Sequence, residues 1–358
     1  MQDSNTSSKV FDGGTTSRNI KMQEPYAGED FKDITSEELS KFRTLTTCWR
    51  CLPESPCIEQ PKSDSISVYK MLERLIVHTP ADRGRLRKYL GDFTQTPEGL
   101  PFRNLYTQHL ELLRWPTSHS CSTEPNDSLE KLAVVGKDGR QYHYLMPAFY
   151  RLLSWLLANG REFAVLIRTY GREGPHITEA VEAFLKGKHP TEKPPSSTNL
   201  PIDPIVWRLK REEAEPNFSL YTDATDSQDS AITQPRRIYQ TWSSWSGLVT
   251  VVDDFVYWQS HHYSHSAAKP VWFDPDDRNA HHILFDDNIR FEDDGTNGID
   301  LLHLNGSISQ RITQTEAINW EGIYFVQANL LKIIRDPEYF IKNVVLCEER
   351  LHVIQEKE

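Results

Sequence analysis

Two adjacent carboxylates, Asp286 and Asp287, follow a short apolar run at residues 283–285. Hard divalent cations such as magnesium prefer carboxylate oxygens as ligands. Parallel strands of an α/β sheet present such ligands at the carboxyl edge of the sheet, where phosphorylated ligands also bind. The spacing therefore predicts a metal and phosphate site, although the further acidic residues at 292–294 also allow a solvated acidic turn.

Three other residues have side chains suited to the same chemistry. Lys269 lies 17 residues ahead of Asp286, and its ammonium can neutralise a phosphate or a carboxylate nucleophile. Thr169 follows the apolar run 163–167, where its hydroxyl and nearby backbone amides can hold a phosphoryl oxygen. Asp12 precedes a Gly-Gly pair, which gives a carboxylate nucleophile the open approach to phosphorus that it requires. Each of the three also has an ordinary alternative as a surface or turn residue.

In chain order, Asp12, Thr169, Lys269 and the pair Asp286 and Asp287 resemble the four motifs of the haloacid dehalogenase (HAD) superfamily of phosphohydrolases. Shorter stretches look like a eukaryotic branch of that superfamily, namely TSRNIKMQ at 16–23, RTYG at 168–171, GKHP at 187–190 and HHILFDDN at 281–288. The resemblance implies that Asp12 is the nucleophile, Thr169 a phosphate ligand and Lys269 the charge stabiliser. It also implies that Asp286 and Asp287, together with Asp12, bind Mg²⁺. The branch itself implies no particular activity.

Gly14 departs from the pattern of the superfamily. Its phosphatases carry a second Asp, which acts as general acid and base, two positions after the nucleophile. Without that group, proton transfer loses a contribution typically worth about 10²–10⁴-fold. We therefore expect a weak or degenerate phosphohydrolase of small phosphorylated molecules with Mg²⁺ as cofactor. The alternative, which Gly14 favours, is a non-catalytic HAD-like binding or regulatory protein.

Other clusters have structural as well as functional explanations. A zinc hydrolase would use His261, His262 and His265 with His281 and His282, but catalytic zinc needs ligands that converge from fixed elements, and this segment is typical of a loop. Three cysteines have the spacing of zinc ligands without a fourth ligand at a usual distance: Cys48, Cys51 and Cys57. Four aromatic residues can stack on a base or sugar, but such residues more commonly pack in a core or an interface: Trp242, Trp245, Tyr257 and Trp258.

Composition and charge exclude several classes of protein. The chain has 358 residues, of which 38% are hydrophobic, so it can bury a substantial core and is not a disordered protein. Its formal net charge of -11 is unfavourable for broad binding to nucleic acid. The first eight residues are polar, and no apolar run approaches the roughly 20 residues of a membrane span. We expect a cytoplasmic protein that binds a small phosphorylated molecule and contacts neither nucleic acid nor membrane.

The segment 31–145 is predicted to be a helical cap inserted into an α/β core. Its apolar residues recur at the i, i+3, i+4 spacing of one helix face at Val68, Met71, Leu72, Leu75 and Ile76. A hairpin turn is expected on the Asp-Gly pair at 138–139. The HAD superfamily inserts a cap between its first and second motifs, which is where this segment lies.

Residues 1–30 and 146–358 are predicted to form the HAD-like core, which is α/β with a Rossmann-like parallel sheet and helices on both faces. The expected elements are strands at 162–171, 248–252 and 283–285, and helices at 147–159, 177–185, 320–331 and 339–351. Residues 190–237 are rich in Pro, Ser, Thr and Asp and are expected to be an irregular surface excursion. This arrangement predicts that Asp12, Thr169, Lys269 and Asp286 converge at one edge of the sheet.

Overall fold

The computed structural model describes residues 99–116, 127–196, 199–213, 217–222, 231–289 and 298–356, together with residues 37, 82, 84–86 and 93–95. The chain divides into two compact units, residues 1–118 with 133–143 and residues 119–132 with 144–358. Every candidate site residue that the structure describes belongs to the larger, second unit.

The smaller unit combines a helix with a β-hairpin. Its described elements are η1 (Phe93–Gln95), η2 (Leu100–Phe102), α4 (Arg103–Leu112), β1 (Ala133–Val135) and β2 (Gln141–His143). The two strands are antiparallel. Gly139, in the turn between them, has a φ of 75°, a backbone conformation that favours glycine. The hairpin predicted on the Asp-Gly pair is therefore confirmed. A helical cap over 31–145 stays a prediction, because most of that segment lies outside the described residues.

The larger unit contains a four-stranded sheet with the strand order β3-β6-β4-β5. Its strands are β3 (Ala164–Thr169), β6 (Gly247–Asp253), β4 (Ile202–Arg211) and β5 (Phe218–Thr222). The first three are parallel to one another, and β5 is antiparallel to β4. All but one of the residues of β6 are buried, as expected for an apolar strand with a partner on each side. The strand β3, expected to be buried on both faces, lies at the edge of the sheet and is half-buried throughout.

The strands β4 and β5 correct the expectation that residues 190–237 form an irregular surface excursion. Both belong to the sheet, and β4 lies between β6 and β5. The Pro, Ser and Thr content of the segment conceals the run 205–209, whose β-branched and aromatic residues favour a strand. Pro204, which has no N–H to donate, lies where the register between β4 and β6 shifts, between Ile202 and Val206.

Different elements cover the two faces of this sheet. On one face lies α7 (Gly174–Leu185), which approaches β6 so closely that a Cβ added at Gly174 would be 3.1 Å from Cβ of Thr250. On the other face, Val251 packs in a core cluster with Tyr239 of α8 (Pro235–Ser244). Successive residues of a strand point to opposite faces, so Thr250 and Val251 mark the two sides.

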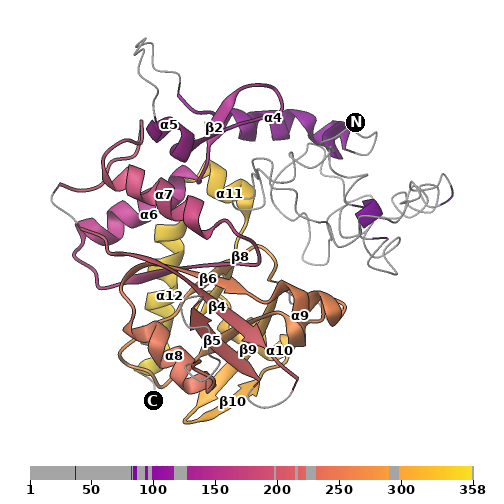
Figure 1. Cartoon of the computed structure of the whole chain (residues 1–358), viewed down its shortest axis with the longest axis vertical. Helices are drawn as coiled ribbons and strands as arrows, with labels where there is room; N and C mark the ends of the chain where they lie inside the picture. Colours follow the sequence, from indigo (N-terminus) through magenta and orange to yellow (C-terminus); the bar gives the residue numbers. More distant parts are fainter. Residues whose placement is uncertain are drawn as a thin grey trace. The chain divides into compact units, whose positions relative to one another are not determined.

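A second sheet, with the strand order β10-β9-β7, packs on the same face as α8 (Figure 1). Its strands are β7 (Lys269–Phe273), β9 (Ile299–Asn305) and β10 (Ile308–Arg311). β7 and β9 are parallel, and β10 is antiparallel to β9. Trp272 of β7 packs in the core cluster with Val251, whereas Val271 and Phe273 pack in a second cluster on the opposite face. Both faces of β7 and β9 are therefore largely buried, as their nearly continuous apolar sequences require, whereas β10 is mostly exposed.

A third, two-stranded sheet packs in the second core cluster. Its parallel strands are β8 (Leu284–Asp286) and β11 (Phe325–Gln327). The helix α12 (Tyr339–Gln355) contributes Leu351 to the same cluster and confirms the helix predicted over 339–351.

The helix predicted over 320–331 is wrong. That part of the chain consists of η5 (Ile318–Trp320), β11 and α11 (Leu330–Arg335). The four consecutive apolar residues 323–326 are all buried. Burial on all sides, rather than along one helix face, is what a short strand between two layers requires.

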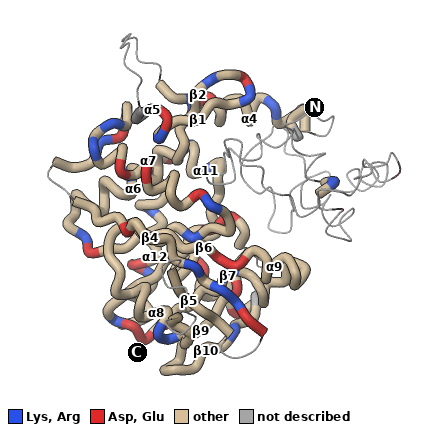
Figure 2. Tube along the Cα trace, in the orientation of Figure 1, with Lys and Arg blue, Asp and Glu red and all other residues tan. Residues whose placement is uncertain are grey.

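The remaining described elements of the larger unit connect these sheets. They are α5 (Asp127–Leu132), α6 (Pro147–Ala158), α9 (Phe255–Ser260), η4 (His265–Ala267) and α10 (Gln314–Ala317). α6 agrees with the helix predicted over 147–159. None of the described helices is long and apolar enough to cross a bilayer. Figure 2 shows basic and acidic residues mixed along the described chain.

The expectation of a mixed α/β protein is confirmed, and parallel strands occur in three sheets. A single Rossmann-like sheet with helices on both faces is not confirmed, because the described parallel strands are divided among these sheets. Within the described part of the chain, β3 pairs with β6 and β8 pairs with β11.

Candidate functional site

Lys269 and Asp286 form an ion pair between two sheets. Lys269 opens β7 and Asp286 ends β8. The Lys269 ammonium donates a hydrogen bond to Oδ2 of Asp286 at 2.9 Å, and the two side chains are only 12% and 7% exposed. The other carboxylate oxygen of Asp286 accepts the backbone N–H of Asn288 at 2.8 Å. The structure therefore joins two of the residues that the sequence singled out and makes them a buried pair.

Tyr170 brings the end of β3 to the same place. It follows Thr169 directly, and the Lys269 ammonium lies 5.1 Å from the centre of its ring, a cation–π contact. The Tyr170 ring also stacks on the ring of Trp258 in α9, with the ring centres 4.9 Å apart. Burial, assisted by the charge of Asp253, raises the pKa of Tyr170 above its ordinary value, so the phenol stays protonated at neutral pH.

The hydroxyl of Thr169 forms hydrogen bonds with residues that follow it in the chain. Its hydroxyl donates to Oε2 of Glu173 at 2.7 Å and accepts the backbone N–H of Gly171 at 2.9 Å. A phosphate on this hydroxyl would face the Glu173 carboxylate at close range, and two such negative charges repel each other. Thr169 thus lies at the predicted strand end, but a phosphate contact would require Glu173 to move.

Asp287 is the more exposed of the two carboxylates. It follows β8, and its Oδ1 accepts a hydrogen bond from the Asn288 side chain at 3.2 Å. Its carboxylate is accessible to a ligand, in contrast to that of Asp286.

The described residues do not supply a complete set of magnesium ligands. Within the described ranges, no three His, Cys, Asp or Glu side chains come together as a metal-binding group. Magnesium requires near-octahedral oxygen coordination, usually with one or two carboxylates, and here the ammonium of Lys269 already neutralises Asp286. Asp12, the third predicted ligand, lies outside the described residues, as does Gly14. Magnesium at this site stays a prediction.

Three of the histidines predicted for the zinc alternative have hydrogen-bond partners other than a metal. His261 hydrogen-bonds through Nδ1 with the carbonyl of Tyr257 at 2.8 Å, and His262 is exposed in a left-handed conformation with a φ of 54°. His281 donates to the carbonyl of Ile323 at 2.7 Å, and His282 lies 2.9 Å from the hydroxyl of Ser243. The described histidines take no part in a metal-binding group, so the zinc alternative gains no support from them. The three cysteines at 48, 51 and 57 lie outside the described residues.

The aromatic residues weighed as a stacking platform pack within the fold. Trp242 is buried in the core cluster beside Trp272, with ring centres 5.3 Å apart. Trp245 lies at the rim of that cluster, against Trp207. Trp258, by contrast, stacks on Tyr170 and so belongs to the surroundings of Lys269.

Sequence reasoning missed Tyr170, Arg168 and Asp253 as parts of this site. Arg168 of β3 makes a bidentate ion pair with Asp253 at the end of β6, and both side chains are buried. The paired register brings Arg168 opposite Val251, which places Asp253 within reach two residues further on. The available signal was an Arg and an Asp at the ends of two apolar runs, because charged residues at the ends of buried strands need partners.

Comparison with known proteins identifies no relative. No protein-family model matches the chain, and searches of the curated proteins and of the solved structures returned no significant match.

Proposed function

We propose that this protein is a HAD-like protein that holds a small phosphorylated molecule beside Lys269, with weak or absent phosphohydrolase activity. One observation carries the proposal. Lys269 and Asp286, which the sequence assigned to one site, form an ion pair in the structure, and Tyr170, the residue after Thr169, lies against the same ammonium group.

The chemistry of the proposed site depends on Lys269. An ammonium held between a carboxylate and an aromatic face can exchange part of its contact with Asp286 for a phosphoryl oxygen, with which it forms a charge-assisted hydrogen bond. Tyr170, protonated at neutral pH, can donate a further hydrogen bond. Magnesium, if Asp287 and Asp12 bind it, would add positive charge beside the same oxygens.

Catalysis in this proposal depends on Asp12. As the nucleophile, its carboxylate would attack phosphorus and break the ester bond, and water would then hydrolyse the acyl phosphate to release phosphate. Gly14 provides no group to protonate the leaving oxygen or to activate that water, so turnover would be slow while binding persists. A binding or regulatory protein is therefore the non-catalytic form of the same proposal.

Titration of the protein with inorganic phosphate and with phenyl phosphate, followed by isothermal calorimetry, tests the proposal. Replacing Lys269 with Gln should weaken phosphate binding by at least about tenfold, since one charge-assisted hydrogen bond is lost. The matched control is Lys342→Gln, because Lys342 pairs with Asp336 on the exposed surface of the same unit. Equal phosphate affinity of wild type and Lys269→Gln would refute the proposal.

The same titration with and without magnesium separates its two forms. Binding that requires magnesium, and is lost in Asp287→Asn, supports the metal-dependent form. Binding that is unchanged by magnesium and by a chelator supports a site in which Lys269 supplies the positive charge.

A further inference from the structure

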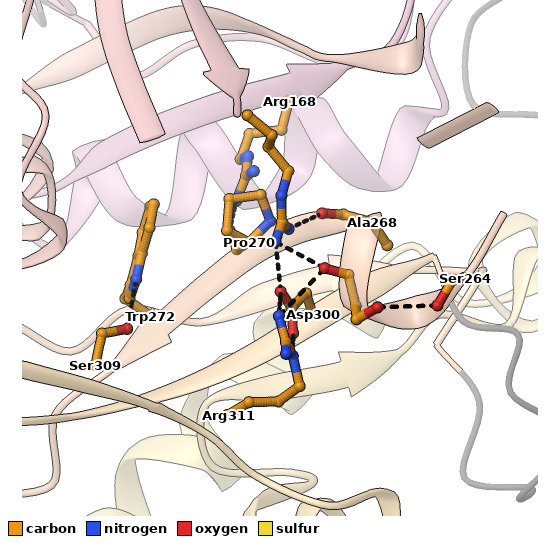
Figure 3. A network of polar contacts seen from close by, with 10 residues as sticks. Arg168, Ser264, Ala268, Pro270, Trp272, Asp300, Ser309 and Arg311 are labelled. Atoms are coloured by element: carbon orange, nitrogen blue, oxygen red, sulfur yellow. Dashed lines mark hydrogen bonds and ion pairs between the residues drawn. The ribbon is translucent and has the colours of Figure 1, made fainter. Parts of the chain in front are cut away.

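Arginine side chains hold the backbone on both sides of Lys269. The carbonyl of Ala268 accepts a hydrogen bond from Nη1 of Arg211 at 2.6 Å. The carbonyl of Pro270 accepts one from Nη1 of Arg168, also at 2.6 Å. Figure 3 shows Arg168, Ala268 and Pro270 within this network. The two arginines come from β3 and β4 of the four-stranded sheet, whereas Lys269 belongs to β7 of the second sheet.

Contacts with Asp253 and Trp242 fix the guanidinium group of Arg168, which also contacts β7. Its Nε and Nη2 both donate to the Asp253 carboxylate, and the two side chains are 7% and 1% exposed. The group also lies 5.0 Å from the ring centre of Trp242. Because a guanidinium is planar and rigid, these contacts leave Nη1 a single direction, which is toward Pro270.

Arg211 is fixed in the same way from the other side. Its Nη2 donates to Oδ2 of Asp300 at 2.9 Å and to the carbonyl of Ser266 at 2.7 Å. Asp300 is fully buried and also forms an ion pair with Arg311, whose Nε donates a hydrogen bond to Oδ1 at 2.6 Å. The chain from Ser266 to Ala268 is thus anchored directly before Lys269.

The effect of this network on the position of the backbone is clearer than its effect on the stability of the protein. Removing two charges from water costs free energy that offsets much of their attraction, so a buried ion pair by itself is weak evidence of stabilisation. Arg168 and Arg211 each donate one further hydrogen bond to a main-chain carbonyl beside Lys269, that of Pro270 and that of Ala268. Held at both neighbours, the backbone of Lys269 has little freedom, and its ammonium is directed at Asp286 at 2.9 Å.

We propose that Arg168 and Arg211 are positioning residues that fix the backbone on either side of Lys269 and thereby aim its ammonium at Asp286. The inference rests on the proposed function for the purpose of that ammonium, since a phosphate-binding lysine must stay in one place. Neither arginine is proposed to contact the phosphorylated molecule.

Acetylation of lysines by an N-hydroxysuccinimide ester, followed by peptide mass spectrometry, tests the proposal. The variants are Arg168→Lys and Arg211→Lys, which keep the positive charge beside Asp253 and Asp300 but cannot serve both the carboxylate and the carbonyl. The pairing of Lys269 should make it react slowly in the wild type. In each variant its rate should rise about tenfold, the equivalent of one hydrogen bond to a charged group. Lys342, which is 59% exposed, serves as the internal reference.

Arg236→Lys is the matched control. Arg236 also joins a carboxylate, Asp274, to a carbonyl, that of Gly306, but it holds the chain after the other end of β7. Its variant should leave the rate of Lys269 unchanged. Circular dichroism confirms that each variant is folded, and the two arginine variants are independent tests, so one that unfolds leaves the other to decide.

The outcomes separate this proposal from the proposed function. Unchanged acetylation of Lys269 in a folded arginine variant removes that arginine from the proposal, and an equal increase in Arg236→Lys overturns it entirely. Inorganic phosphate binding is measured on the same samples. Faster acetylation in the variants, with no phosphate binding by the wild type, would refute the proposed function and leave the positioning role intact.

Discussion

Lys269 and Asp286 depend on each other because both are largely buried. A buried carboxylate without a counter-charge, or a buried ammonium without one, is costly, whereas an exposed ion pair contributes little. Within the proposed site, this pair therefore has a clear energetic consequence.

Breaking the pair should destabilise the protein strongly. Lys269→Met and Asp286→Asn should each lower the free energy of unfolding by about 3–5 kcal/mol, since each leaves one buried charge without its partner. The double variant should lose clearly less than the sum of the two. Urea unfolding of the four proteins gives the coupling free energy. Additive losses would show that the pair does not exist, and Lys342→Met, which alters an exposed pair, should have almost no effect.

His282 gives a prediction for pH. Burial lowers the pKa of His282 to about 4, and its ring stacks on Tyr239 at 4.3 Å. Because the unfolded chain binds this proton near pH 6.5 and the folded chain does not, stability should fall as the pH drops from 6.5 toward 4. Between pH 7.5 and pH 5 this amounts to about 2 kcal/mol.

Urea unfolding at those two pH values, in wild type and in His282→Gln, measures this contribution. Glutamine can still hydrogen-bond with Ser243 but does not titrate, so the variant should lose less stability on acidification. An identical pH dependence in the two proteins would contradict the assignment of His282.

Residue types and spacing predicted the ion-paired residues of this site better than the arginines that hold the backbone beside them. Lys269 and Asp286 were recognisable because each stands beside an apolar run. The roles of Arg168 and Arg211 depend on which strands become neighbours, because each reaches β7 from another sheet. Sequence separations of 57 and 102 residues in these hydrogen bonds leave no local pattern to detect.

At the scale of elements, β4 changes most in importance. Expected to lie in an irregular excursion, it pairs with β6 on one side and β5 on the other, and Leu209 on it is 1% exposed. Its position also explains why Arg211, at its carboxyl end, reaches the start of β7.

Hydrogen exchange tests the place of β4. The amides of Val206 and Leu209 should exchange as slowly as those of Val251 in β6, through unfolding of the whole unit. The nearby residues 193–196, which lie in no helix or strand, should exchange quickly. Exchange of β4 at the rate of residues 193–196 would show that it is not an interior strand.

Long periodic segments were predicted well, as were the strands at 248–252 and 283–285, which are β6 and β8, whereas the run 323–326 was not. The helices α6 and α12 were found because their apolar residues repeat over several turns. The run 323–326 was assigned to a helix because four apolar residues fit either element, and only burial between two layers decides for the strand. The Pro residues around β4 concealed that strand for a similar reason.

At the scale of the whole molecule, Gly14 is proposed to separate binding from turnover. Replacing Gly14 with Asp should increase magnesium-dependent hydrolysis of an aryl phosphate by about tenfold or more, since a proton-transfer group typically contributes 10²–10⁴-fold. Asp12→Asn should abolish whatever activity is present. A wild type that already turns over at the roughly 1–10³ s⁻¹ of ordinary enzymes would contradict the assignment, as would full activity in Asp12→Asn.

A crystal structure of the protein soaked with magnesium and tetrafluoroaluminate, a mimic of a transferring phosphoryl group, tests the central claim most directly. We predict that the anion lies within about 3 Å of the Lys269 ammonium, near the end of β3, with the Asp12 carboxylate on its other side. An anion bound elsewhere, or an Asp12 carboxylate more than roughly 10 Å from that of Asp286, too far to share a metal with ligand distances near 2.1 Å, would contradict the phosphate site.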